Sequence, residues 1–322
     1  MLVRVFALIA LVGAVVTSMT TWRAATPVDA AATMAHAAPD VVRPAPMPAF
    51  DDPDPDRAPP AALGRVTVPA KAPARWSSRR QEFERSDDLF AFARRLQPAA
   101  DAGDAEARWL VSRVHDYCGA YAQAPLDYTR DTALMARVAP RVARALEGAR
   151  DRVAARCGRF LPGDVGGFLQ LVAQRQEAAL AGSLASEAAL LAMGEPLVDD
   201  ELYRRDLVAR VQASRDPDAY MALAPAMGLA AAGDAALAGA VSGTRMSELA
   251  WQLASCRLGL DCSQGGALMT QYCANGGICA RAPQQDFSTF VHQAALSPGE
   301  ADEVDEMVNM LLMEHSHEVV MR

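Results

Sequence analysis

The stretch CRLGLDCSQGGALMTQYCANGGIC, residues 256–279, holds four of the six cysteines of this 322-residue chain. Five, ten and five residues separate these four cysteines in order. The chain also begins with an apolar segment typical of export signals, so the cysteines are expected to meet an oxidising compartment. In such a compartment a cluster of this kind indicates a pair of disulfide bonds.

The spacing limits which cysteines can pair. A helix is expected between Cys262 and Cys273, because Ser263 is a suitable N-cap and apolar residues follow at helical spacing. At 1.5 Å per residue the helix separates the two cysteines by roughly 16 Å, whereas a disulfide tolerates about 7 Å between Cα atoms. Cys262 and Cys273 should therefore not pair with each other.

The favoured pairs in this stretch are Cys256 with Cys262 and Cys273 with Cys279. Residues 244–257 read as a helix followed by a glycine, which places Cys256 beside the turn that carries Cys262. Each pair closes a small loop around a helix end, and the chain-entropy model gives about 2 kcal/mol for each.

A zinc ion bound by the same four thiolates is the alternative. Zinc sites usually bring cysteines in pairs with two to four residues between them, and the gaps here are wider. The strings C-x-x-C-H of haem attachment and C-x-x-C of thioredoxin-type sites do not occur in the sequence. Disulfides are therefore preferred, and no cofactor is expected.

The first residues, 1–23, read as a signal peptide or an N-terminal membrane anchor. Arg4 precedes an apolar run, and the uncharged residues 5–22 reach the lower length limit of a membrane span. Cleavage near Ala30 and retention as an inner-membrane anchor both remain open. Either outcome places the bulk of the chain outside the cytoplasm, as a periplasmic or secreted protein or as an anchored one facing the periplasm.

Residues 24–78 are expected to form a disordered linker, since eleven of the 20 prolines lie among them beside a short acidic run. Residues 79–322 contain many alanine-rich segments with helical period and no run of alternating β-branched residues. The predicted fold class is all-α, an irregular array of antiparallel helix hairpins held by disulfides.

Capping residues mark the expected helices. A first hairpin should start at Ser86, turn at Gly103 and continue from Asp104. Asp164 is expected to cap a helix over residues 168–180, and later helices are expected to start at Asp216 with Pro217 and at a capping box over residues 297–300. The apolar positions of the first two helices are Leu89, Phe92, Ala93 and Leu96, then Ala107, Leu110, Val111, Val114 and Cys118.

A single helix kinked at Pro140 is expected after the first hairpin and before Asp164. Its apolar side carries Leu134, Val138, Val142, Ala145, Ala149, Val153 and Cys157. Because Cys118 and Cys157 each end a helix of neighbouring hairpins, the third disulfide should join them. The loop of about 40 residues that it closes corresponds to roughly 4 kcal/mol.

Three strings share alanine, glycine and a small capping residue: AADAGDAEARWL, ALAGSLASEAALL and AAAGDAALAGAV. They resemble the corner between helices of Sel1-like repeats, which are related to tetratricopeptide repeats. The resemblance implies helix hairpins stacked in a superhelix. The corner glycines Gly103, Gly182 and Gly233 lack a fixed period, so the predicted array is irregular. The cysteine block also resembles those of exported proteins of Gram-negative bacteria; neither resemblance supplies a site residue.

Composition excludes several functions. Lys71, in the linker, is the only lysine, so a P-loop, a Schiff-base enzyme, a Ser-x-x-Lys acyl transferase and a kinase are excluded from the folded part. With a net charge of −8 and no basic cluster in the helical part, nucleic acid is not an expected partner.

The five histidines do not form a metal-binding pattern. His36 lies in the linker, His115 and His292 lack a second histidine at i+4, and His315 and His317 are two residues apart. No metal ligand is therefore predicted.

Carboxylates remain as possible catalytic groups. Glu187, Glu201 and Glu248 are candidates for a general acid acting on a glycan, although each is explained more simply as a helix-surface or first-turn charge. The leading hypothesis is a non-enzymatic scaffold that exposes a groove to another envelope protein. The alternative is a cell-wall glycan hydrolase using a single carboxylate, which requires a cleft with a desolvated glutamate.

Overall fold

The computed structural model describes residues 77–280, 282 and 284–313. The predictions for the signal segment, the linker, His36, His315 and His317 therefore lie outside the described residues. Within the described residues the secondary structure is helical and no β-strand forms, which confirms the all-α fold class. None of the described helices has the length and hydrophobicity that a membrane span requires.

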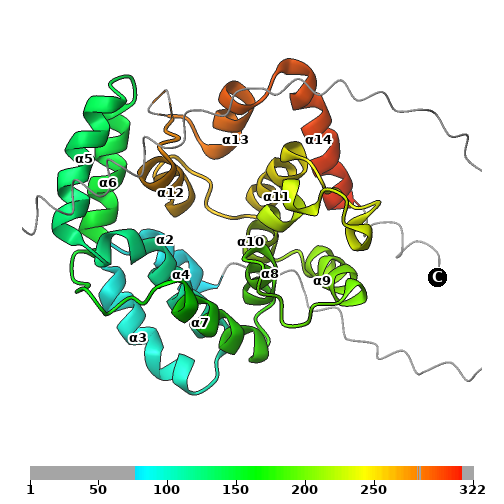
Figure 1. Cartoon of the computed structure of the whole chain (residues 1–322), viewed down its shortest axis with the longest axis horizontal. Coiled ribbons are helices and arrows are strands. Elements are labelled where there is room, and N and C mark those ends of the chain that lie inside the picture. The colour runs from blue at the N-terminus through cyan, green and yellow to red at the C-terminus, as the bar shows by residue number, and fades with distance from the viewer. Residues whose placement is uncertain (1–76, 281, 283, 314–322) are drawn as a thin grey trace, which may run out of the picture. The chain divides into compact units, whose positions relative to one another are not determined.

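The helices pack mostly against their neighbours in sequence: α3 against α4, α5 against α6, and α7 against α8 (Figure 1). Helix α10 also packs against α8 and α11, and α12 packs against α6. The bounds are α2 Ser78–Arg85, α3 Leu89–Asp101, α4 Ala105–Ala122, α5 Pro125–Val138, α6 Ala143–Cys157, α7 Phe168–Leu180, α8 Leu184–Ala192, α9 Glu201–Ser214, α10 Pro217–Met227, η1 Leu229–Ala231, η2 Ala235–Leu237, α11 Arg245–Arg257, α12 Ala267–Gly276, α13 Phe287–Phe290, η3 Val291–Ala295 and α14 Pro298–Met313.

Two of the three similar strings form the same corner. Gly103 and Gly182 both have positive φ, at 93° and 100°, where glycine is favoured. The next residue then caps the following helix: Asp104 accepts the Ala107 N–H at 2.9 Å, and Ser183 does the same for Ser186. Gly233 instead lies between the short turns η1 and η2. The structure is thus compatible with a helical repeat fold without being regular.

The helix expected across Pro140 is two antiparallel helices, so that prediction is wrong. The residue before the proline is disfavoured in the helical region, and Ala139 has φ −119° and ψ 63°. Leu134 and Val138 are 53% and 78% exposed, and Ala145 is also exposed. The side of α5 that packs inward carries Tyr128, Thr132 and Ala136.

Two predicted helix starts are displaced by a few residues: Asp88 caps α3 instead of Ser86, and α12 begins after Gly266 instead of after Ser263. Helix α7 has the predicted bounds, but Gly167 precedes it and the predicted cap Asp164 does not cap it. Asp164 accepts the Leu161 N–H at 2.7 Å, because a short acidic side chain can close a local turn in competition with capping. The predicted caps Asp104 and Asp216 and the bond from the Ser297 N–H to Glu300 are present.

The structure pairs Cys118 with Cys157, Cys256 with Cys262, and Cys273 with Cys279, with Cα–Cα distances of 5.5, 5.7 and 4.3 Å. These are the pairs that the sequence favours, and no described cysteine is free. The first bond joins α4 to α6 in the core, and the second closes the loop between α11 and α12. Three disulfides indicate an oxidising environment.

Two buried arginines of α6 hold neighbouring helices by their carbonyl groups. Arg156 donates to Ser86 O at 2.8 Å and to Phe83 O, at the C-terminus of α2. Arg150 donates to Tyr128 O at 2.9 Å and to Ala274 O at 3.1 Å, joining α5 and α12 to α6. A guanidinium suits these positions because its donors point in several fixed directions, and the bound carbonyl groups of α2 and α12 lie at helix C-termini, which attract positive charge.

We expect the Cys118–Cys157 bond to contribute more stability than the Cys256–Cys262 bond. Replacing both members of the first pair by alanine should lower the free energy of unfolding by about 4 kcal/mol, and the second pair by about 2 kcal/mol, since the first closes a longer loop. Urea unfolding of the two double variants without reductant measures the difference. Equal losses would contradict this assignment.

Candidate functional site

A cleft of about 270 Å³ opens between α2, α4, α7, α8, α10 and α12; we call it the central cleft. Because these helices lie far apart in sequence, the cleft depends on the completed fold. Its apolar lining is Trp109, Ala189, Ala192, Met193, Met221, Ala222, Pro225, Leu260 and Leu268, and its charged lining is Glu84, Asp116, Asp218, Asp261, Arg113 and Arg175.

Helix periodicity explains how two of the helices line the cleft. Trp109, Arg113 and Asp116 lie three or four residues apart and therefore share one face of α4. On α10 the residues that line the cleft are Asp218, Met221, Ala222 and Pro225, which have the same spacing. The side-chain caps Asp104 and Asp216 begin these two helices and so set the position of each face.

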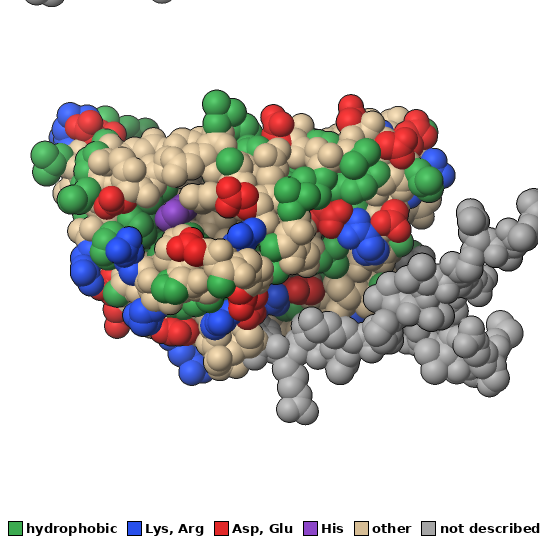
Figure 2. All heavy atoms as spheres, turned by 90° about the horizontal axis from the view of Figure 1, so that it is seen from below, with side chains coloured by type: hydrophobic (Ala, Val, Ile, Leu, Met, Phe, Trp, Pro, Cys, Tyr) green, Lys and Arg blue, Asp and Glu red, His purple; other side chains and the backbone are tan. Residues whose placement is uncertain are grey.

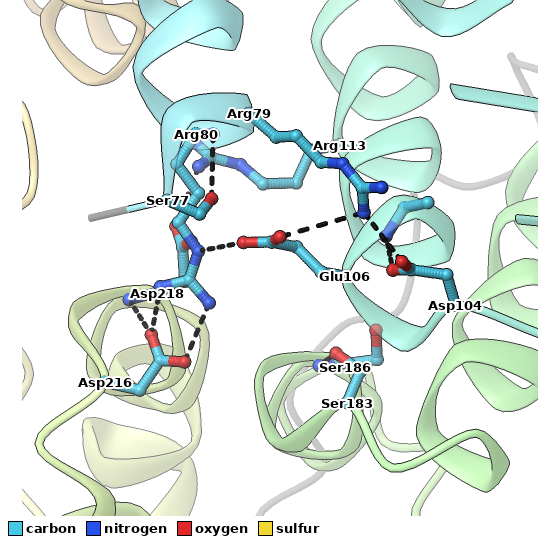
Figure 3. Close-up of polar contacts among 11 residues, drawn as sticks. Ser77, Arg79, Arg80, Asp104, Glu106, Arg113, Ser183, Ser186, Asp216 and Asp218 are labelled. Carbon is cyan, nitrogen blue, oxygen red and sulfur yellow. Dashed lines mark hydrogen bonds and ion pairs between the residues drawn. The ribbon is translucent and has the colours of Figure 1, made fainter. Parts of the chain in front are cut away.

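An ion-pair network braces the cleft from outside. Arg80 of α2 binds Asp216 through both terminal nitrogens, at 2.7 and 2.9 Å, and approaches Glu106 at 3.3 Å (Figure 3). Arg79 donates to Asp104 at 2.7 Å. The N-terminal turns of α4 and α10 are thereby tied to α2.

Arg113 connects this network to the cleft. Its guanidinium donates to Asp218 at 2.8 Å, lies 4.5 Å from the centre of the Phe83 ring and is 3.9 Å from Glu84. Asp218 is also 3.1 Å from Arg80, so two arginines compensate its buried charge.

Glu84 is a buried carboxylate of the cleft that, unlike Asp218, has no short ion pair. Its side chain is only 5% exposed, and its Oε2 accepts the N–H of Ala267 at 3.0 Å. Ala267 begins α12, and the preceding Gly266 has no side chain to cap this helix. Burial raises the pKa of Glu84 above its ordinary value, nearby Asp261 raises it further, and Arg113 and the Ala267 N–H oppose the shift.

A second hollow of about 350 Å³ lies between α4 and α7 and shares Asp116 with the central cleft. We call the two hollows together the α4 groove. Asp116 and Arg175 form an ion pair of 2.7 Å. The second hollow is lined by three amide side chains, an imidazole and a phenyl ring, which belong to Gln123, Gln170, Gln174, His115 and Phe168.

Phe168 differs from the other residues of this groove because it is a large hydrophobic residue that is 55% exposed. It is the first residue of α7 and lies beside the exposed Leu169. On the face of the domain that Figure 2 shows, acidic and basic side chains are interspersed with hydrophobic ones, so no field of a single sign dominates that face.

The three glutamates proposed from the sequence do not line the central cleft. Glu187 binds Arg210 through both oxygens, at 2.6 and 2.8 Å, and Glu201 is an exposed first-turn residue of α9. Glu248 is half-buried on α11, and burial raises its pKa. Glu84 was missed because α2 precedes the first helix that the sequence suggested.

The histidines described by the structure have protein partners. His115 Nδ1 lies 2.9 Å from Gln174 Oε1, and burial lowers the pKa of its imidazole. His292 lies 2.8 Å from Ser288 O and 3.3 Å from Asp305. Among the described residues no group of three or more histidine, cysteine, aspartate or glutamate side chains is arranged to hold a metal ion.

Comparison of the chain with known protein families, with curated proteins and with solved structures gives no match.

The raised pKa of Glu84 leads to a prediction for Glu84→Gln. The folded protein holds the Glu84 proton more tightly than the unfolded chain, so the wild type loses stability relative to the glutamine variant as the pH rises through this pKa. We expect the melting temperature of Glu84→Gln minus that of the wild type to be larger at about pH 7 than at about pH 4.

Differential scanning calorimetry at both pH values measures this difference. Glu147→Gln, on the exposed side of α6, controls for the loss of one carboxylate. A difference that grows on acidification would contradict the assignment of Glu84.

Proposed function

We propose that this protein is an exported, non-enzymatic scaffold of the cell envelope that binds another protein along the α4 groove. The observation that carries the proposal is the half-exposed Phe168 at a hollow that shares Asp116 with the central cleft. Large exposed aromatic side chains beside a concave surface are typical anchors of protein interfaces.

The lining of the groove also suits a polypeptide. Gln123, Gln170 and Gln174 offer amide donors and acceptors, which can match the N–H and C=O groups of an extended peptide. The Sel1-like resemblance of the helix corners agrees with this function, since helical repeat arrays commonly bind proteins on concave surfaces.

The proposed location follows from the disulfides and the N-terminal segment. Three disulfides require an oxidising compartment, and residues 1–23 have the features of an export signal. We place the helical domain in the periplasm or the secreted fraction; if residues 5–22 are retained, it faces the periplasm from the inner membrane.

Site-specific photocrosslinking tests the scaffold proposal. A benzophenone amino acid at position 168, expressed in the native host, should give a discrete crosslink to an envelope protein. The same group at Leu202, which is 71% exposed on α9, is the matched control and should not give that product. Identical products from both positions, or none from position 168, would refute partner binding in the α4 groove.

A second candidate function is supported by Glu84. A desolvated glutamate in a cleft is what a glycan hydrolase with one acidic group requires, because a raised pKa favours the protonated carboxyl. In this reaction Glu84 would donate its proton to the glycosidic oxygen as the C–O bond breaks. Water would add to the anomeric carbon and release a proton to the solvent, so that a single carboxyl group suffices.

Release of reducing ends from purified peptidoglycan distinguishes this second function. A hydrolase should lose nearly all activity in Glu84→Gln and keep it in Glu248→Gln. Glu248 is the matched control, since its carboxyl is also partly buried with a raised pKa but lies outside the cleft. Absence of activity in the wild-type protein, or equal activity in both variants, would exclude Glu84 as the acid.

A further inference from the structure

We propose that the central cleft receives a basic side chain, a lysine or arginine, of the protein bound along the α4 groove. This inference rests on the proposed scaffold function and specifies the chemistry of the partner. It is argued from the charge left uncompensated in the cleft, from the apolar wall beside that charge, and from the position of the cleft in the groove.

The charges that line the central cleft are not balanced. Four carboxylates and two arginines contribute to its surface. Arg175 is bound to Asp116 at 2.7 Å, and Arg113 is bound to Asp218 at 2.8 Å. Both arginines are therefore engaged by other acids, and the remaining lining carries excess negative charge.

Glu84 and Asp261 hold this excess. Glu84 is 3.9 Å from Arg113, which is beyond hydrogen-bond length, and its closest polar partner is the neutral Ala267 N–H. Asp261 accepts the Ser263 N–H at 3.0 Å and has no ion pair among the described residues. A positive group placed between the two carboxylates would relieve their mutual repulsion.

Groups from the surrounding helices supply only part of this positive charge. Arg113 approaches Glu84 from α4 at 3.9 Å, but its short contact is with Asp218. Arg156 of α6 also attracts the Glu84 carboxylate, but its nitrogens are held by the carbonyl groups of Phe83 and Ser86 and do not bind it. From the loop before α12 the neighbouring charge is Asp261, which is negative.

The rest of the cleft suits the stem of such a side chain. Met193, Met221 and Leu268 form part of an apolar wall beside the carboxylates. Lysine and arginine commonly bury their methylene groups along apolar surface while the charged end meets an acid. The central cleft shares Asp116 with the hollow that Phe168 lines. One peptide could therefore place an extended segment in that hollow and a basic side chain in the central cleft.

Titration with N-acetyl-lysine methylamide, followed by NMR through the indole N–H of Trp109 in the cleft, tests the inference. The signal is assigned with Trp109→Phe. We expect saturable binding in the millimolar range, and none by N-acetyl-norleucine methylamide, which has a similar length without the charge. Glu84→Gln and Asp261→Asn should each weaken binding about fivefold, and Glu147→Gln should not change it.

The pH dependence gives a second readout. Binding requires the ionised Glu84, whose pKa is raised by burial, so affinity should fall as the pH is lowered from about 7 to about 4. Equal binding of the lysine and norleucine compounds, or no binding of the lysine compound to folded wild-type protein, would overturn the inference. Lysine binding without a crosslink at position 168 would uphold the basic-side-chain site and refute the scaffold proposal instead.

Discussion

The hydrogen bond from the Ala267 N–H to Glu84 joins α2 to α12 across 183 positions of the chain. It supplies the cap that Gly266 cannot provide, and it places a negative charge at the positive end of α12. The same contact fixes one wall of the central cleft. Leu260 and Asp261 form another wall of the cleft. They belong to the loop between α11 and α12, which the Cys256–Cys262 bond closes. The cleft therefore depends jointly on this carboxylate and on that disulfide.

Arginine side chains connect helices throughout this domain, in which lysine is absent from the described residues. Arg156 and Arg150 hold carbonyl groups of three neighbouring helices, whereas Arg113 links Asp218 to the Glu84 region. A lysine ammonium is a more compact and more strongly hydrated charge, so it would be costlier to bury among several separate acceptors. The helices of this domain are consequently connected by guanidinium groups as well as by apolar packing.

Local signals allowed much of the fold to be predicted from the sequence. Caps at Asp104 and Asp216, and the short spacing of the last four cysteines, depend on neighbouring residues and are readable without a structure. The buried face of α5 could not be predicted in this way. Leu134 and Val138 fit a four-residue period that continues past Pro140, but the helix ends before this proline and both side chains are exposed. The candidate site was harder still, since nothing near Glu84 in the sequence indicates that α12 will bury it.

The chemistry of position 84 shows why a function should be sought in the central cleft. Capping of α12 needs only an oxygen acceptor, which the neutral side chain of glutamine also offers. A carboxylate in the same place carries a desolvation cost that its distant contact with Arg113 and its bond to Ala267 do not remove, as the direction of its pKa shift indicates. Structure alone therefore does not require a charge here. A ligand that meets this charge would recover part of that cost on binding, and the open side of the cleft gives the ligand a way to reach it.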